Sequence, residues 1–167
     1  MKNIILTIII LFATISCKSQ LNNLNDTELF DGIRFNNVTL SQIMKSKGKL
    51  NQMKILFGNN IVEEANDTGP YIGKELSNNN IVFSFEDETD SGNNYDLTYI
   101  DILNSNVIVN VKGLSIKIGD DKNKFGNLLF NPSDSSYNFT DKDTGSVGLS
   151  FKIDRSNKVS AIELICF

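Results

Sequence analysis

Four segments of the chain largely alternate between apolar and polar residues. They are NIVFSFEDE at 80–88, LTYIDIL at 97–103, VGLSFKID at 147–154 and VSAIELICF at 159–167. Successive side chains of a β-strand point to opposite faces, so each segment has one apolar and one polar face. Strands of this kind are typical of antiparallel sheets with one face packed and the other in water. The four segments therefore predict a sheet that is buried on one side only.

Two further segments show helical spacing. The apolar residues of LNQMKILFG, at 50–58, recur three and four positions apart, and a glycine closes the segment. A second helix is expected at 121–129, capped by Asp120 or Asp121 and ended by Pro132. Helices with one apolar stripe bury it most economically against the apolar face of a sheet. The sequence thus predicts an α+β fold, an antiparallel sheet with helices packed on one face.

The order of helix and strands occurs twice. FSFED at 83–87 corresponds to LSFKID at 149–154. This favours two tandem helix-plus-strands repeats, at 39–103 and 114–167. The alternative is a single sheet without duplication, which would have much the same architecture.

The second face of such a sheet would be polar and open to a partner. Its expected members are Ser84, Glu86, Thr98, Asp101, Ser150, Lys152, Ser160 and Glu163.

The first sixteen residues, MKNIILTIIILFATIS, have the order of a secretory signal peptide. Lys2 is followed by an apolar run and then by small side chains. The run is shorter than the roughly 20 residues of a transmembrane helix. A core helix is the alternative, but consecutive apolar residues cover every helix face rather than one stripe. We expect 1–16 to be a signal peptide.

Cys17 follows at once, in ATISCKSQ. This string resembles the lipobox of bacterial lipoproteins, with Thr14 where leucine is usual. The resemblance implies cleavage before Cys17 and a diacylglycerol on its thiol, which anchors the exported protein to a membrane. Lys18 instead of Asp favours the outer membrane, facing the periplasm or the cell surface. The alternative is ordinary signal-peptidase cleavage beside an unmodified cysteine.

The rest of the chain divides into two parts. Residues 17–29 hold the lipidated cysteine and a polar stretch that reads as a tether. Residues 30–167 form a single domain. Cys166 is the only other cysteine, so a lipidated Cys17 leaves no internal disulfide, and the apolar run AIELICF predicts a buried, inert Cys166 thiol.

Composition excludes several classes of function. The chain has no His, which rules out His-based catalysis and His-ligated metals. Its net charge of −4 argues against nucleic acid, which requires a basic surface. Nucleotide-binding glycine motifs are absent. We expect no enzyme activity and no cofactor.

The acidic loop FEDETDSGNNYD, at 85–96, is the best place for a metal. Asp87, Glu88 and Asp90 offer the oxygen ligands that Ca²⁺ prefers. In a calcium-loop register, however, Thr89 and Ser91 take ligand positions and the closing glutamate is missing. The favoured interpretation is a solvated hairpin loop without a metal.

A resemblance to a known superfamily rests on the layout of the two halves. A glycine, Gly58, ends the first helix, and IGDDKNKFGNLL, at 118–129, begins the second copy. With the lipobox, this resembles the SmpA/OmlA (BamE-like) and β-lactamase-inhibitor-protein-like superfamily. The resemblance implies a small, sometimes duplicated unit in envelope lipoproteins that bind other proteins. The Gly-Met-Thr motif of the BamE type is absent, so assembly-machine function is not carried over.

The sequence leads to one principal functional hypothesis. It is a non-catalytic, lipid-anchored cell-envelope lipoprotein whose domain binds an unknown protein partner. The alternative is a periplasmic immunity or inhibitor protein against a toxin or hydrolase, whose basic surface its acidic charge would match. A small enzyme or ligand-binding module is the third hypothesis.

Overall fold

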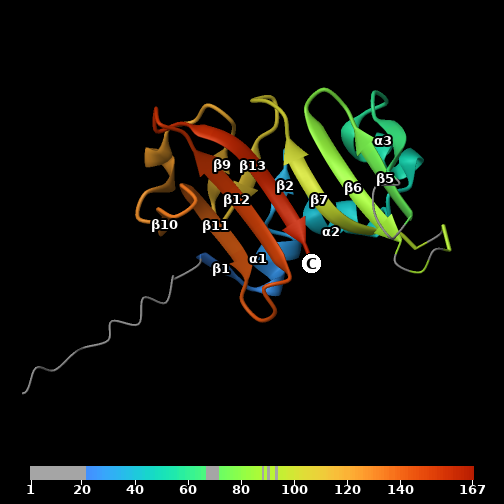
Figure 1. Ribbon diagram of the computed structural model, residues 1–167, viewed down its shortest axis with the longest axis horizontal. Coiled ribbons are helices and arrows are strands. Elements are labelled where there is room, and N and C mark those ends of the chain that lie inside the picture. The colour runs from blue at the N-terminus through green and yellow to red at the C-terminus, as the bar shows by residue number, and fades with distance from the viewer. Residues whose placement is uncertain (1–21, 67–71, 88, 90, 93) are drawn as a thin grey trace, which may run out of the picture.

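The structure is a computed structural model that describes residues 22–66, 72–87, 89, 91–92 and 94–167 (Figure 1). A nine-stranded sheet contains β1 (Asn22–Leu24), β4 (Val62–Asn66), β5 (Ile72–Ser77), β6 (Ile81–Asp87), β7 (Asp96–Ile102), β10 (Phe130–Asn131), β11 (Ser136–Asp141), β12 (Val147–Ile153) and β13 (Val159–Cys166). A four-stranded sheet contains β2 (Arg34–Phe35), β3 (Val38–Thr39), β8 (Val109–Val111) and β9 (Leu114–Ile116). The helices are α1 (Asp26–Phe30), α2 (Leu40–Lys45), α3 (Leu50–Phe57) and the 3₁₀ turn η1 (Lys122–Phe125). None of the helices in the described ranges has the length and apolar character needed to cross a membrane.

The predicted α+β fold is wrong, because the protein is mostly β. About 45% of the described residues lie in strands and 17% in helices. The helix expected at 50–58 exists as α3, but the one expected at 121–129 is only the single turn η1. Gly126 follows that turn with φ 57°, a conformation that ends it, and the chain then enters β10. The layer over the large sheet thus combines a small second sheet with short helices.

The four alternating segments form the centre of the large sheet. They are the hairpins β6–β7 and β12–β13, as predicted. The two hairpins are joined because β7 pairs antiparallel with β13. The sheet order is β1-β11-β12-β13-β7-β6-β5-β4, with β10 beside β11, and the pairing of β1 with β11 is parallel.

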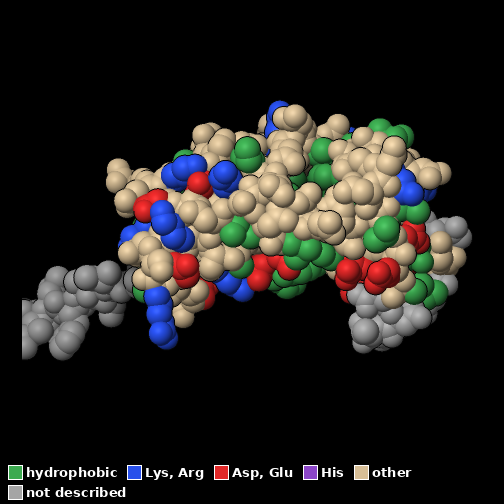
Figure 2. Space-filling model, turned by 90° about the horizontal axis from the view of Figure 1, so that it is seen from above, with side chains coloured by type: hydrophobic (Ala, Val, Ile, Leu, Met, Phe, Trp, Pro, Cys, Tyr) green, Lys and Arg blue, Asp and Glu red, His purple; other side chains and the backbone are tan. Residues whose placement is uncertain are grey.

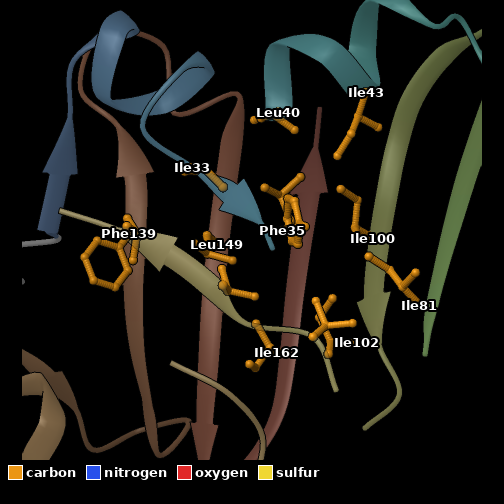
Figure 3. Close-up of a cluster of buried hydrophobic side chains, with 14 of the residues drawn as sticks. Ile33, Phe35, Leu40, Ile43, Ile81, Ile100, Ile102, Phe139, Leu149 and Ile162 are labelled. Carbon is orange, nitrogen blue, oxygen red and sulfur yellow. The ribbon is translucent and has the colours of Figure 1, made fainter. Parts of the chain in front are cut away.

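The core lies between the two sheets. Figure 3 shows apolar side chains from both layers that point toward one another. From the covering layer come Ile33 just before β2, Phe35 in β2, and Leu40 and Ile43 in α2. From the large sheet come Ile81, Ile100, Ile102, Phe139, Leu149 and Ile162, and all ten side chains are buried. Each fully buried side chain of this size contributes roughly 1.5–3 kcal/mol.

The two halves of the chain occupy corresponding places in both sheets. In the large sheet, β4 to β7 lie on one side of the β7–β13 seam and β10 to β13 lie on the other. In the small sheet, hairpin β2–β3 pairs with hairpin β8–β9 through β2 and β8. Both hairpins turn on a non-glycine residue with positive φ, Asn36 at 56° and Lys112 at 48°. A duplicated unit would give this arrangement, although common ancestry of the halves stays a prediction.

The polar stretch before residue 30 belongs to the domain, so the predicted tether is wrong for residues 22–29. Leu24 in β1 and Leu29 in α1 are buried in the core. Asn25 caps α1 by accepting from the Glu28 N–H at 2.9 Å, and the Glu28 carboxylate accepts from the Asn25 N–H at 3.0 Å. This reciprocal cap and two leucines are enough to fold a stretch that is otherwise polar.

Candidate functional site

One face of the large sheet carries the small sheet and the helices, and the other face is uncovered. In Figure 1 the uncovered face is turned toward the viewer, and no described element lies over it. We call it the open face. Its side chains form two rows across the paired strands, Asn138-Ser150-Glu163-Asp101-Val82-Ser77-Val62 and Thr140-Gly148-Ile165-Tyr99-Ser84-Glu75-Glu64. Their neighbours along each strand point inward and are mostly buried, as alternation requires.

The centre of the open face holds two carboxylates in direct opposition. Asp101 on β7 pairs in register with Glu163 on β13. Tyr99 lies two residues before Asp101 on the same face and pairs with Ile165. Lys152 donates to Glu163 at 2.9 Å, with its own side chain 46% exposed. Among the described residues no cation forms an ion pair with Asp101, so one carboxylate of the pair is matched and the other is not.

The electrostatics of this centre follow from burial and from like charge. Partial burial, and then the Glu163 carboxylate, raise the pKa of Asp101 above its ordinary value. Burial, followed by the charges of Asp101 and Glu163, raises the pKa of Tyr99 to about 12. The Tyr99 hydroxyl is therefore neutral at physiological pH and is a hydrogen-bond donor toward solvent.

The rest of the open face is acidic as well. Glu64 on β4 stands directly opposite Glu75 on β5, a second like-charge pair, and Glu86 lies on the same face of β6. Figure 2 shows acidic side chains alternating with hydrophobic ones along the lower edge of its view, whereas most of the Lys and Arg lie toward the left half. Like charges placed directly opposite one another destabilise a sheet. The open face carries two such like-charge pairs, Asp101–Glu163 and Glu64–Glu75.

A shallow hollow of about 360 Å³ lies beside this centre, over β11, β12 and β13. It is lined by Asp134, Asn138, Phe139, Thr140, Gly148, Leu149, Ser150, Lys152, Glu163, Ile165 and Phe167. Gly148 lines the hollow, and a Cβ built at this position meets no atom within 4 Å. Phe167, which also lines it, is 87% exposed. The hollow is open to solvent.

Asp87 is the one candidate metal ligand of the three that lies among the described residues, and groups of the chain itself surround its carboxylate. Asp87 is buried, and it accepts hydrogen bonds from the Thr89 N–H at 2.9 Å and the Asn94 N–H at 3.1 Å. The hydroxyls of Thr89 and Ser91 also donate to it. The bond from the Thr89 hydroxyl is the largest effect holding the pKa of Asp87 well below its usual range, against the opposing effect of burial. Asp87 therefore fixes the loop after β6, while Glu88 and Asp90 lie outside the described residues.

The loop after β11 is built in the same way. Asp141 accepts from the N–H groups of Asp143 and Thr144 at 2.9 and 3.3 Å and from the Thr144 hydroxyl. Oxygens of Asp26, Asp141 and Asp143 lie within 4.8 Å of one another. Because the loop's own donors already satisfy Asp141, this acidic group is accounted for by the turn.

Of the two cysteines, Cys166 lies among the described residues. Cys17, the predicted lipidation site, lies outside the described residues. Cys166 at the end of β13 is a free, half-buried thiol whose pKa burial raises to about 12. It is protonated and unreactive at neutral pH, which agrees with the inert core thiol expected from its sequence context.

Sequence reasoning found part of the open face. Of the predicted polar residues, six share it: Ser84, Glu86, Asp101, Ser150, Lys152 and Glu163. Thr98 instead occupies a bulge where β7 loses register with β6, and its hydroxyl donates to the Ser84 carbonyl at 3.2 Å. Ser160 bonds the Lys152 carbonyl at 3.3 Å. The alternation of 97–103 also puts Tyr99 opposite the inward Ile100 and Ile102, as the structure has it. Gly148 was missed as a surface feature, although the alternation of its strand was a signal that could have placed it.

Comparison of the chain with protein-family models, with curated proteins and with solved structures finds no match.

Proposed function

We propose that this chain is a non-catalytic, lipid-anchored protein of the cell envelope, and that it binds a protein partner through the open face. The observation that carries the proposal is the uncovered side of a nine-stranded sheet. A face that exposes Tyr99, Ile165 and Phe167 among polar residues has the composition of a protein interface, with aromatic and aliphatic side chains inside a polar surround.

The hollow at Gly148 favours docking over chemistry. Its volume is within the range of small-molecule sites. Its charged lining, however, includes Lys152 and Glu163 paired with one another, and the chain has no His to act as a base. The open hollow beside Gly148 would receive an apolar side chain of the partner, in the way that anchor residues fill pockets at protein interfaces.

The membrane anchor belongs to the same proposal and rests on the lipobox string at Cys17. Metabolic labelling with a fatty-acid analogue tests it. Wild type should be labelled and Cys17→Ala should not. Equal labelling of both would refute the anchor without touching the open face.

Partner binding is tested by immunoprecipitation of the untagged protein from detergent-solubilised envelope, since a C-terminal tag would cover Phe167. Gly148→Leu fills the hollow, and the control Ile55→Lys changes a side chain of α3 that is 83% exposed. We expect one specific protein with wild type and Ile55→Lys and its loss with Gly148→Leu. Recovery of the same proteins with all three would refute docking on this face.

An immunity or inhibitor protein is the second candidate function, and the acidic open face favours it. Secreted hydrolases and toxins that act on anionic targets carry basic surfaces, which this face would complement. Inhibition of the recovered partner's activity by the purified protein would distinguish this function from simple scaffolding.

A further inference from the structure

The open face has an unmatched charge at its centre. Glu163 has a cation within the chain, Lys152 at 2.9 Å, whereas Asp101 opposite it has no ion-pair partner among the described residues. Tyr99 lies next to Asp101 on the same face, one strand repeat away, so that a carboxylate and an aromatic ring adjoin.

We propose that the occupant of the open face is a protein with a basic surface, and that an arginine of this protein supplies the cation for Asp101. The inference rests on the proposed function and names the chemistry of its partner. A guanidinium can bond a carboxylate with two parallel N–H groups and can at the same time stack on an aromatic ring. Asp101 and Tyr99 present these two acceptors side by side.

The acidic charge of the open face opposes binding of a second copy of this chain, of anionic phospholipids and of nucleic acids. A second copy of this chain would bring Glu64, Glu75 and Glu163 against the same carboxylates, and such like-charge contacts oppose association. Anionic phospholipids and nucleic acids are repelled for the same reason. A basic protein surface relieves both like-charge pairs when it binds.

The arrangement explains why the face tolerates its own repulsion. The Asp101–Glu163 and Glu64–Glu75 oppositions cost stability in the free protein. Binding of cationic side chains converts that cost into affinity, because each carboxylate then gains a partner. Lys152 is bonded to Glu163 and forms no ion pair with Asp101, on which its charge has a smaller effect than the like charge of Glu163.

A peptide-binding experiment tests the charge. Full-length protein in detergent micelles is titrated with fluorescent deca-arginine, with deca-glutamate as the reference probe. We expect deca-arginine to bind, deca-glutamate not to bind, and Asp101→Asn to weaken deca-arginine binding about tenfold. The matched control is Asp31→Asn, the same charge change at an exposed position after α1, on the covered side. Equal weakening by both variants, or no binding of deca-arginine, would overturn the inference.

Crosslinking in cells tests the class of occupant. A photoreactive amino acid replaces Ser150 or Ser84 on the open face, and Ile55 on α3 as the control. A crosslink from the two serines to an arginine-containing segment of another protein, absent from position 55, supports the inference. A crosslink to a neutral or acidic segment overturns the charge assignment but leaves the proposed function standing. Crosslinks only to a second copy or to lipid overturn both.

Discussion

Asp101 on β7 and Glu163 on β13 stand directly opposite one another, on the seam between the two central hairpins. The strands that carry them are about 60 residues apart in the sequence and belong to the two different halves of the fold. A sheet ordinarily sets opposite charges or neutral groups at such positions. The pair therefore costs the free protein stability, a cost that the proposed partner would offset on binding.

Neutralising Asp101 should stabilise the free protein. Asp101→Asn removes the repulsion from Glu163 and should raise the free energy of unfolding by about 0.2–1 kcal/mol at pH 7, as measured by urea denaturation. Because the folded pKa of Asp101 is raised, its unfavourable contribution is absent below the unfolded pKa and develops as pH rises through the folded pKa. The gain should thus shrink as pH falls through the folded pKa of Asp101 and be absent below the unfolded pKa near 4. The companion Glu163→Gln, which also loses the Lys152 ion pair, should gain less; a larger gain there would contradict this account.

The phenol of Tyr99 should lose its proton at a higher pH than an ordinary tyrosine. Its pKa of about 12 reflects burial and the two neighbouring carboxylates, so Asp101→Asn should lower it, as followed by ultraviolet absorbance of the phenolate. The folded pKa is raised above the ordinary value of 10, so this group's stabilisation is complete below pH 10 and is lost as pH rises toward 12. Tyr99→Phe identifies the signal by removing it. An unchanged titration in Asp101→Asn would show that Asp101 does not act on Tyr99.

Replacement of Asp87 should loosen the loop after β6 and change the acid response. Asp87→Asn loses charge-assisted hydrogen bonds from Thr89 and Ser91, so its melting temperature should be lower at pH 7. The folded pKa is depressed, so the stabilisation is present above the unfolded pKa near 4 and is lost as pH falls through the folded pKa. The two proteins should converge in strong acid. Thr89→Val, which removes the strongest donor, should reproduce part of the loss, and identical melting at pH 7 would argue against the role.

The assigned strand faces can be tested with buried aromatics. Phe85→Asp and Phe151→Asp place an unpaired carboxylate where the native ring is 0% exposed, and each should destabilise by several kcal/mol or prevent folding. Ile55→Asp, at a position 83% exposed, should stay within about 0.5 kcal/mol of wild type. Circular dichroism during thermal denaturation measures all three. Mild effects at Phe85 and Phe151 would mean that the faces are reversed.

Two glycines offer a matched pair. Gly148→Ala adds a methyl group in open space on a strand, and it should leave stability unchanged or raise it by up to about 1 kcal/mol. Gly48→Ala should destabilise by about 2 kcal/mol or more, because Gly48 has φ 61° and the new Cβ would lie 2.9 Å from the ring of Phe85. Chemical denaturation of both variants compares them directly. Equal effects would deny the hollow at Gly148.

The sequence predicts the fold best where its pattern is local. Ile81, Phe83 and Phe85 recur at every second position, and the hairpin they belong to is where it was expected. The helix expected at 50–58 from its local spacing likewise forms, as α3 over Leu50–Phe57. Both signals lie within a few residues of the structure they specify.

The predictions that failed depend on distant partners. β11 reads as a polar turn region after Pro132, and it becomes a strand because β12 and β1 pair with its two sides. Leu24 and Leu29 are too few to show a periodicity, although the cap from Asn25 to Glu28 was readable. The opposition of Asp101 and Glu163 requires the β7–β13 register, which no local pattern contains.

The parallel pairing of β1 with β11 limits how far the domain can travel. With the proposed lipid on Cys17, the anchor and Asn22, the first residue of β1, are separated by a chain contour of about 18 Å at most. A domain of this size is about 40 Å across, which is more than the length of that chain segment, so the domain would stay close to the bilayer surface. A partner on the same membrane would meet it at high effective concentration, and a partner in free solution would gain no such advantage. By holding the chain at Asn22, β1 would thus favour encounters with partners on the same membrane over encounters with partners in solution.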